Sequence, residues 1–89
     1  MKLCRIEWND AVADSSWTHI EEIKDKHIEH CITVGYLVEE AEDCYKLSST
    51  LGMDGNAMGF TLIPKDMTTK IYELSEKEST EITLETEDE

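Results

Sequence analysis

The stretch Leu62-Ile63-Pro64-Lys65-Asp66-Met67, together with residues 68–74 that follow it, decides the expected fold. The apolar run over 60–63 predicts a short strand. Pro64 ends that strand, because proline has no N–H to donate to a ladder. Residues 68–74 are rich in Thr, Ile and Tyr and predict a second strand. The chain therefore passes from one strand to the next through a single turn.

Three further strands are expected upstream. Residues 3–8 alternate between apolar and charged side chains, as in a half-buried strand. Residues 30–39 are rich in β-branched and aromatic residues, and residues 44–51 alternate again. The acidic run 40–43 between them predicts a tight turn and hence a hairpin. Gly35, inside a strand, suggests a bulge or a close backbone approach.

One short helix is expected in the long loop that follows the first strand. Thr18 and Glu21 fit a capping box, in which Thr18 is the N-cap. Ile20, Ile23 and Ile28 fall roughly on one helical face. These signals predict a helix over 18–26.

Five short strands without a long helix predict a mainly β fold. The strand, turn and strand at residues 62–74 resemble the end of an SH3-like barrel, which implies that the turn is of the 3₁₀ type. We therefore expect a five-stranded SH3-like barrel over residues 1–75, with one short helix in the first long loop. Residues 76–89 form an acidic tail, which is solvated or adds an edge strand at 81–85.

The formal charge of −13, from 21 acidic and 8 basic residues, restricts the partners. Direct binding to nucleic acid is disfavoured, since that needs clustered Lys and Arg. A basic protein surface and a small ligand in a local pocket both remain open. Three cysteines without close spacing favour a reducing compartment. With no apolar leader and no apolar run long enough for a membrane span, the expected location is the cytoplasm.

Three blocks resemble a family of small bacteriophage proteins: residues 6–10 with 15–17, residues 34–38 with 45–47, and residues 62–65 ending at Ile71 and Leu74. The resemblance covers about residues 4–75. It implies an accessory protein of the host cytoplasm that counters bacterial defence. Some SH3-like phage proteins sequester nucleotide immune signals, usually as oligomers with pockets between subunits, so the resemblance implies a nucleotide-derived ligand and a homo-oligomer.

The candidate ligand-binding residues are Trp17, Ser15, Ser16, Lys65 and Tyr36. Trp17 is suited to stack on a nucleobase, while the two serines donate to phosphate or ribose. The alternative is that Trp17 is a lid that packs the loop onto the barrel, whereas Trp8 is expected in the core. Lys65 is one of few cations able to meet a phosphate, or it forms a surface ion pair.

Other chemistry is not expected. His27, His30 and Cys31, with Cys4, have the donor types of a zinc site, but their spacing matches no motif. As a Cys/His nucleophile the cluster lacks an orienting third group. Asp10 and Asp14 are expected as turn residues. We therefore expect no catalytic residue, no metal and no cofactor, and a protein that is not an enzyme.

Two functions are weighed for this non-enzymatic binding protein. In the first it sequesters a nucleotide-derived signal through the Trp17 loop, with the glycine-rich segment 52–59 as a mobile loop or lid. In the second it is an acidic inhibitor that blocks a basic nucleic-acid-binding surface of a host defence protein, and the acidic tail mimics a phosphate track. Salt dependence separates them, since the second is the more electrostatic.

Overall fold

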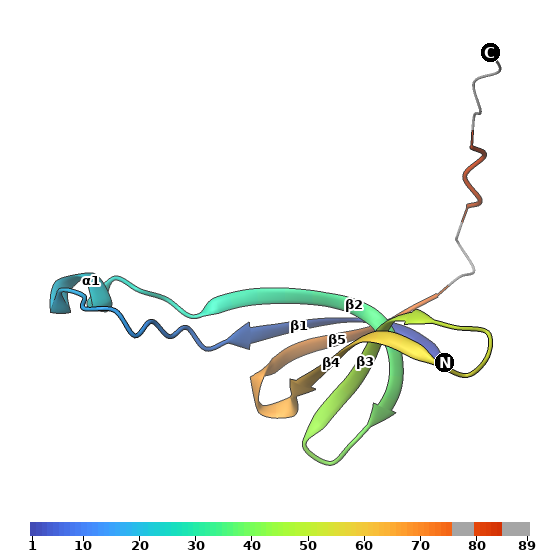
Figure 1. The fold of residues 1–89 in the computed structure, drawn as a ribbon, viewed down its shortest axis with the longest axis horizontal. Coiled ribbons are helices and arrows are strands. Elements are labelled where there is room, and N and C mark those ends of the chain that lie inside the picture. The colour runs from blue at the N-terminus through green and yellow to red at the C-terminus, as the bar shows by residue number, and fades with distance from the viewer. Residues whose placement is uncertain (76–79, 85–89) are drawn as a thin grey trace.

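The protein is mainly β: a computed structural model describes residues 1–75 and 80–84 and contains one sheet of five antiparallel strands (Figure 1). The strands come in the order β4-β3-β2-β1-β5. The elements are β1 (Lys2–Asp10), α1 (Ile20–Lys24), β2 (Glu29–Glu40), β3 (Cys44–Leu51), β4 (Ala57–Pro64), the 3₁₀ turn η1 (Lys65–Met67) and β5 (Thr68–Leu74).

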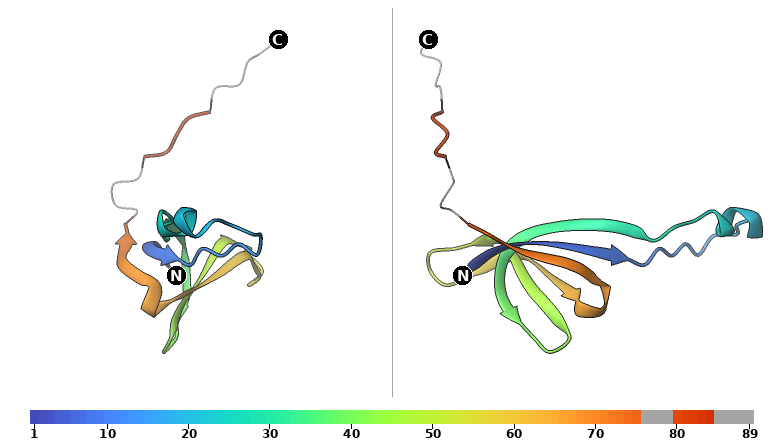
Figure 2. Two further views of the ribbon diagram at one scale, coloured as in Figure 1. Left: turned by 90° about the vertical axis from the view of Figure 1, so that its left-hand side faces the viewer. Right: turned by 180° about the vertical axis from the view of Figure 1, so that it is seen from behind.

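The topology confirms the expected fold class. Strands β1 to β4 form a meander, and β5 returns to pair with β1 on the side opposite β2. The sheet curls strongly, so that β3 and β4 turn away from the line of β1 and β2 (Figures 1 and 2). Turn η1 lies between β4 and β5, where Lys65 N–H donates to the carbonyl of Asp43 over 2.9 Å. The size and this strand order fit a small barrel-like fold.

The core of the barrel is small. Its buried hydrophobic side chains come from three strands: Cys4 and Ile6 from β1, Leu47 from β3 and Ile63 from β4. Trp8 packs against this cluster as expected, together with Leu37 and Tyr45. Inward-facing residues alternate with outward-facing ones along β1, which is the pattern that predicted the strand.

Gly35 marks a close approach of two strands rather than a bulge. A Cβ on Gly35 would lie 3.0 Å from the carbonyl oxygen of Ser48 and 3.3 Å from the Cβ of Leu47. The register shifts occur elsewhere, between Glu7 and Trp8 and between Leu37 and Glu39. Glycine is therefore needed in β2 because the backbone of β3 leaves no room for a side chain.

Ser48 is the buried polar residue of the described sheet, and its hydroxyl is satisfied. Its Oγ lies 2.9 Å from the carbonyl oxygens of both Thr50 and Met58. The hydroxyl thus bonds main-chain groups in β3 and β4 where the side chain has no access to water. Burial of a hydroxyl without such partners would cost stability.

The segment between β1 and β2, residues 11–28, reaches away from the sheet and is called the arm below (Figures 1 and 2). Its helix α1 is shorter than the expected 18–26, and the expected capping box is wrong. His19 is the N-cap and makes no side-chain cap bond, while the Thr18 hydroxyl points to the carbonyl of Ser16 at 3.4 Å. A helix of five residues gains little by itself, so the local signals did not extend it.

The tail is described only in part. Residues 81–84 lie in no strand, and Glu85, the last residue of the suggested edge strand, lies outside the described residues, as do 76–79 and 86–89. In the described part of the chain, no helix has the length and apolar character needed to cross a bilayer.

Candidate functional site

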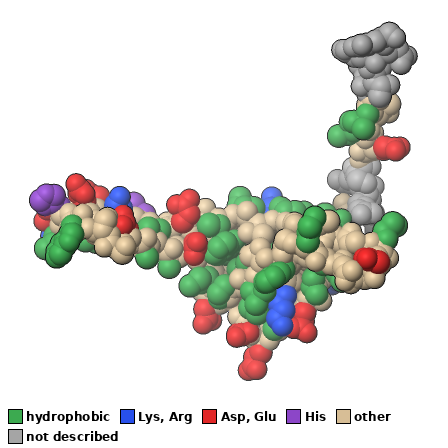
Figure 3. Space-filling view, in the orientation of Figure 1, with side chains coloured by type: hydrophobic (Ala, Val, Ile, Leu, Met, Phe, Trp, Pro, Cys, Tyr) green, Lys and Arg blue, Asp and Glu red, His purple; other side chains and the backbone are tan. Residues whose placement is uncertain are grey.

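The described structure has a hollow in the arm. It has a volume of about 1200 Å³, and it is formed by both sides of the arm, from Val12 to Thr18 and from Glu22 to Ile28. Figure 3 shows hydrophobic, acidic and histidine side chains gathered at this end of the molecule. The hollow is broad and open, so it presents a binding surface rather than an enclosed cavity.

Trp17 stands at this hollow with its indole free. The residue is 103% exposed, so it makes no packing contact with the barrel and does not act as a lid in this structure. Ile20 and Ile23 of α1 are also exposed, at 71% and 56%. Trp17 and Ile23 line the same hollow, so they give it an exposed apolar surface.

The hydroxyl groups of Ser15 and Ser16 differ in whether they are already hydrogen-bonded. Asp14 accepts hydrogen bonds from the backbone N–H of Ser16 over 2.9 Å and from its hydroxyl over 2.8 Å. The backbone bond, followed by the hydroxyl bond, lowers the pKa of the Asp14 carboxyl below its usual value. Asp14 is thus the turn residue that the sequence predicted, and Ser15 is the serine of the pair that keeps its hydroxyl for a ligand within the described contacts.

Lys26 supplies the positive charge of the hollow. It lines the hollow and lies close enough to Asp14 to contribute to the lowered pKa of that carboxyl. It forms no ion pair among the described residues. Lys24, two residues earlier, lies outside the hollow lining and pairs with Glu21 over 3.1 Å. Lys26 is therefore the arm cation that is available to an anionic ligand.

Two of the five candidate ligand-binding residues lie elsewhere. Lys65 is in η1, on the barrel, where its Nζ lies 3.1 Å from Glu40 and 5.4 Å from the ring centre of Tyr45. Tyr36 lies in β2, opposite Leu3 of β1. The structure brings Ser15, Ser16 and Trp17 together in the arm, and it places Lys65 and Tyr36 on the sheet.

A second, smaller hollow of about 300 Å³ lies at the end of the sheet next to the arm, lined in part by Asn9, His30 and Cys31. Nδ1 of His30 forms a hydrogen bond with Oδ1 of Asn9, which gives His30 the orienting partner that the sequence did not reveal. Cys31, however, pairs in register with Trp8 and points to the face of the sheet opposite His30, because successive strand residues point to opposite faces.

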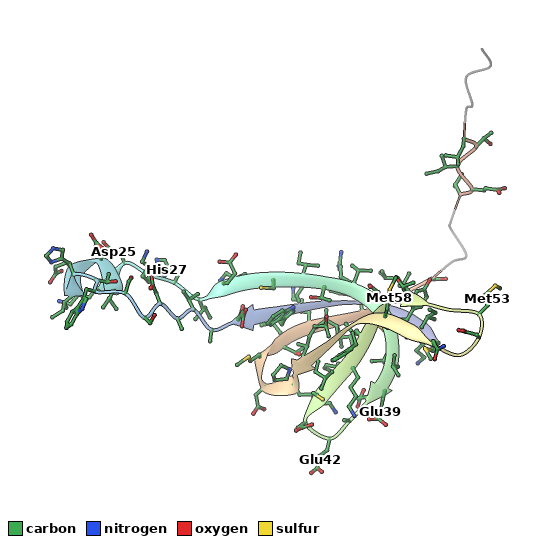
Figure 4. All side chains as sticks on the ribbon, in the orientation of Figure 1. Asp25, His27, Glu39, Glu42, Met53 and Met58 are labelled. Carbon is green, nitrogen blue, oxygen red and sulfur yellow. The ribbon has the colours of Figure 1, made fainter. Side chains whose placement is uncertain are left out.

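The chemistry of Cys31 follows from that placement. Its Sγ is 3.9 Å from the carbonyl of Glu29, and burial, with the nearby charges of Asp10 and Glu29, raises the pKa of its thiol. A raised pKa disfavours the thiolate that a nucleophile needs. His27 lines the arm hollow instead, and its position there is labelled in Figure 4. Within residues 1–75 and 80–84, no three His, Cys, Asp or Glu side chains are grouped to hold a metal ion.

The glycine-rich loop between β3 and β4 lies at the far end of the sheet from the arm (Figure 1). Gly52 N–H donates to the carbonyl of Asn56 over 2.7 Å, and Asn56 N–H donates to Asp54 over 3.2 Å. The loop is thus a hydrogen-bonded turn that closes a hairpin, and it does not cover the arm hollow.

Comparison of the chain with protein-family models, with curated proteins and with solved structures finds no match.

Sequence reasoning missed Lys26 as a candidate. Lys24 and Lys26 both lie in the last turn of the expected helix 18–26, where either suits the negative end of the helix dipole, so the sequence does not distinguish them. The helix ends at Lys24, so Lys26 leaves the helical surface and turns toward the residues before α1. Whether Lys24 or Lys26 reaches the hollow depends on how the two sides of the arm face each other. This is a tertiary feature that no local sequence pattern encodes.

Proposed function

We propose that this protein is a non-enzymatic binding protein that holds a nucleotide-derived ligand in the hollow of its arm. The observation that supports the proposal is the fully exposed indole of Trp17 beside an unpaired lysine and a free serine hydroxyl. A nucleobase stacks on an aromatic face, and a phosphate takes a cation and hydroxyl donors. One ligand of that chemistry uses Trp17, Lys26 and Ser15 together.

The biological setting of the proposal comes from the resemblance to small bacteriophage proteins. Under that setting the protein acts in the host cytoplasm and sequesters a nucleotide immune signal, so that the signal does not reach its receptor. Sequestration requires tight binding without turnover. The three functional residues then serve only to bind, and the released ligand is chemically unchanged.

The first test is a thermal-shift screen of the full chain with cyclic dinucleotides, cyclic oligonucleotides and ADP-ribose. A ligand that binds the native state alone raises Tm by mass action. The nucleotide that shifts Tm is then titrated by calorimetry and recovered after denaturation for mass analysis. An intact nucleotide supports sequestration, whereas a converted nucleotide would make the protein an enzyme. The absence of a shift with every probe would count against the proposal.

Two matched variants test the site. We expect Trp17→Ala to weaken binding about tenfold to a hundredfold, as loss of one stacked base contact does. Lys26→Gln should weaken binding of a phosphate-bearing probe, while Lys24→Gln removes an equal charge from the same arm outside the hollow and should leave the affinity nearly unchanged. If both lysine variants weakened binding equally, the effect of Lys26 would come from the overall charge of the arm and not from a specific contact with the ligand.

A second candidate function rests on the charge of −13. We propose as the alternative that the acidic surface blocks a basic nucleic-acid-binding surface of a host protein. At the end of β2, Glu39 and Glu40 are engaged by Lys46 and Lys65, whereas Glu42 in the β2–β3 turn forms no ion pair among the described residues (Figure 4). This function predicts strong salt dependence and an effect of removing 76–89, with no effect of Trp17→Ala.

A further inference from the structure

Strand β4 is an open edge of the sheet and carries no charge. It lies at one end of the strand order, and β3 is its single neighbour among the described strands. Residues 55–64 contain no Asp, Glu, Lys or Arg, in a chain that is 33% charged. The other edge strand, β5, carries Lys70 and Glu73. Charged residues on an edge hinder pairing with another chain, so β5 is protected in this way and β4 is not.

The edge is also regular and apolar on its outer side. The pairing of β3 with β4 runs from Cys44–Pro64 to Leu51–Ala57 without a register shift, so no bulge interrupts the edge that β4 offers to another strand. Met58, Phe60 and Leu62 alternate along it and are 69%, 80% and 51% exposed. Figure 4 shows Met58 on this strand, away from the arm. These three side chains have no partner in the described fold that removes them from water.

We propose that β4 is a homodimer interface, in which the β4 strands of two copies pair antiparallel and join the two sheets into one. A second copy is the occupant because of the charge. Two chains of −13 repel each other over most of their surfaces, and at physiological ionic strength the repulsion acts within about 8 Å of each charge. The uncharged strand is where two copies can approach with least repulsion.

Antiparallel pairing of a strand with its own copy is also self-complementary. It creates a two-fold axis, so each strand offers the other the same residues in reverse order, and the assembly closes at two copies. The apolar side chains Met58, Phe60 and Leu62 of one copy then lie beside those of the other. These side chains bury roughly 500 Å² in total, which is less than a standard specific interface buries. We therefore expect a weak, transient dimer that dissociates in the high micromolar range.

The test is sedimentation velocity of the full chain from about 1 µM to about 1 mM, which spans the expected range of affinity. We expect the mass to rise from 10.2 kDa to twice that value. Higher salt should strengthen the dimer, because it screens the repulsion between like charges. Phe60→Glu should give a monomer over the whole range, and Phe60→Thr, which keeps β propensity, should weaken the dimer without loss of fold.

The matched control is Ile32→Glu. Ile32 is 67% exposed, but it lies in β2, where it pairs with Glu7 of β1 and precedes the part of β2 that pairs with β3. The control adds the same charge to an exposed apolar position away from β4 and should leave the dimer intact. A monomer at every concentration would overturn the proposal. So would a dimer that survives Phe60→Glu or one that Ile32→Glu breaks. Binding of nucleotide at the arm is measured separately in Phe60→Glu, so the two proposals fail independently.

Discussion

The indole Nε1 of Trp8 donates a hydrogen bond to Oγ1 of Thr33 over 2.9 Å, from β1 to the neighbouring strand β2. The bond gives a polar partner to a side chain whose ring packs against the barrel core. Trp8→Phe removes the donor and keeps an aromatic ring, and Thr33→Val removes the acceptor at nearly constant shape. We expect each change to cost about 1 kcal/mol of unfolding free energy in urea titrations.

The double variant decides whether the bond itself causes the loss. If it does, Trp8→Phe with Thr33→Val costs less than the two single changes together, since the second change has no bond left to break. Strict additivity of the two losses would mean that packing, and not the hydrogen bond, sets the value.

Gly35 provides a second test of the barrel. An alanine Cβ there meets the main-chain oxygen of Ser48 at 3.0 Å, and a backbone atom in a paired strand moves only if the sheet moves. We expect Gly35→Ala to lower the unfolding free energy by about 1–3 kcal/mol. Val34→Ala, at a half-exposed neighbour, should cost much less. A loss at Gly35 no larger than that at Val34 would contradict the close approach of β2 and β3.

The two tryptophans should differ sharply in their access to solvent. Trp17 is fully exposed in the arm, while Trp8 is partly buried against the core. Acrylamide is neutral, so the negative charge of the chain does not bias it. We expect acrylamide to quench Trp17 strongly in the Trp8→Phe variant and Trp8 weakly in the Trp17→Phe variant. Similar quenching constants for both would mean that the arm folds back over Trp17.

The turn at Asp14 should respond to acid. Its folded-state pKa lies below the usual 3.8, because the Ser16 backbone N–H and hydroxyl bond the charged form. A lowered pKa stabilises the turn above the unfolded pKa, and this contribution is lost as the pH falls through the folded pKa. The Ser16 amide resonance should therefore shift in NMR spectra only below about pH 4. In Asp14→Asn it should not follow this titration, and a folded Asp14 pKa above 3.8 would contradict the geometry.

The strands of the barrel could be predicted from the sequence because local residue patterns indicate them. Residues 44–51 alternate and residues 68–74 are rich in Thr, Ile and Tyr, and the structure begins and ends the strands at those same residues. Pro64 and the turn after it also have a local cause, the missing N–H donor. The fold class and most strand positions were therefore predictable without knowledge of the packing. Strand β4 is the exception, because it begins at Ala57, inside the glycine-rich segment 52–59 that was expected to be a loop.

The arm shows where this reasoning stops. Thr18 and Glu21 have the spacing of a capping box, but a cap contributes only about 1 kcal/mol, which does not hold a helix that buries no residue. Lys65 was a reasonable phosphate ligand on composition, yet its partner Glu40 is 25 residues away in sequence. Pairings of that kind depend on the finished fold, and for this reason the cation of the proposed site had to be found in the structure.

The separation of the arm from the barrel has a consequence for how such a protein changes over generations. The four buried apolar side chains belong to the sheet, while α1 buries none. Substitutions in α1 and at Trp17 therefore have little effect on the folding equilibrium, since distant and independent sites add without coupling. Single substitutions in the arm can therefore change what the protein binds, and selection for a stable barrel does not remove them.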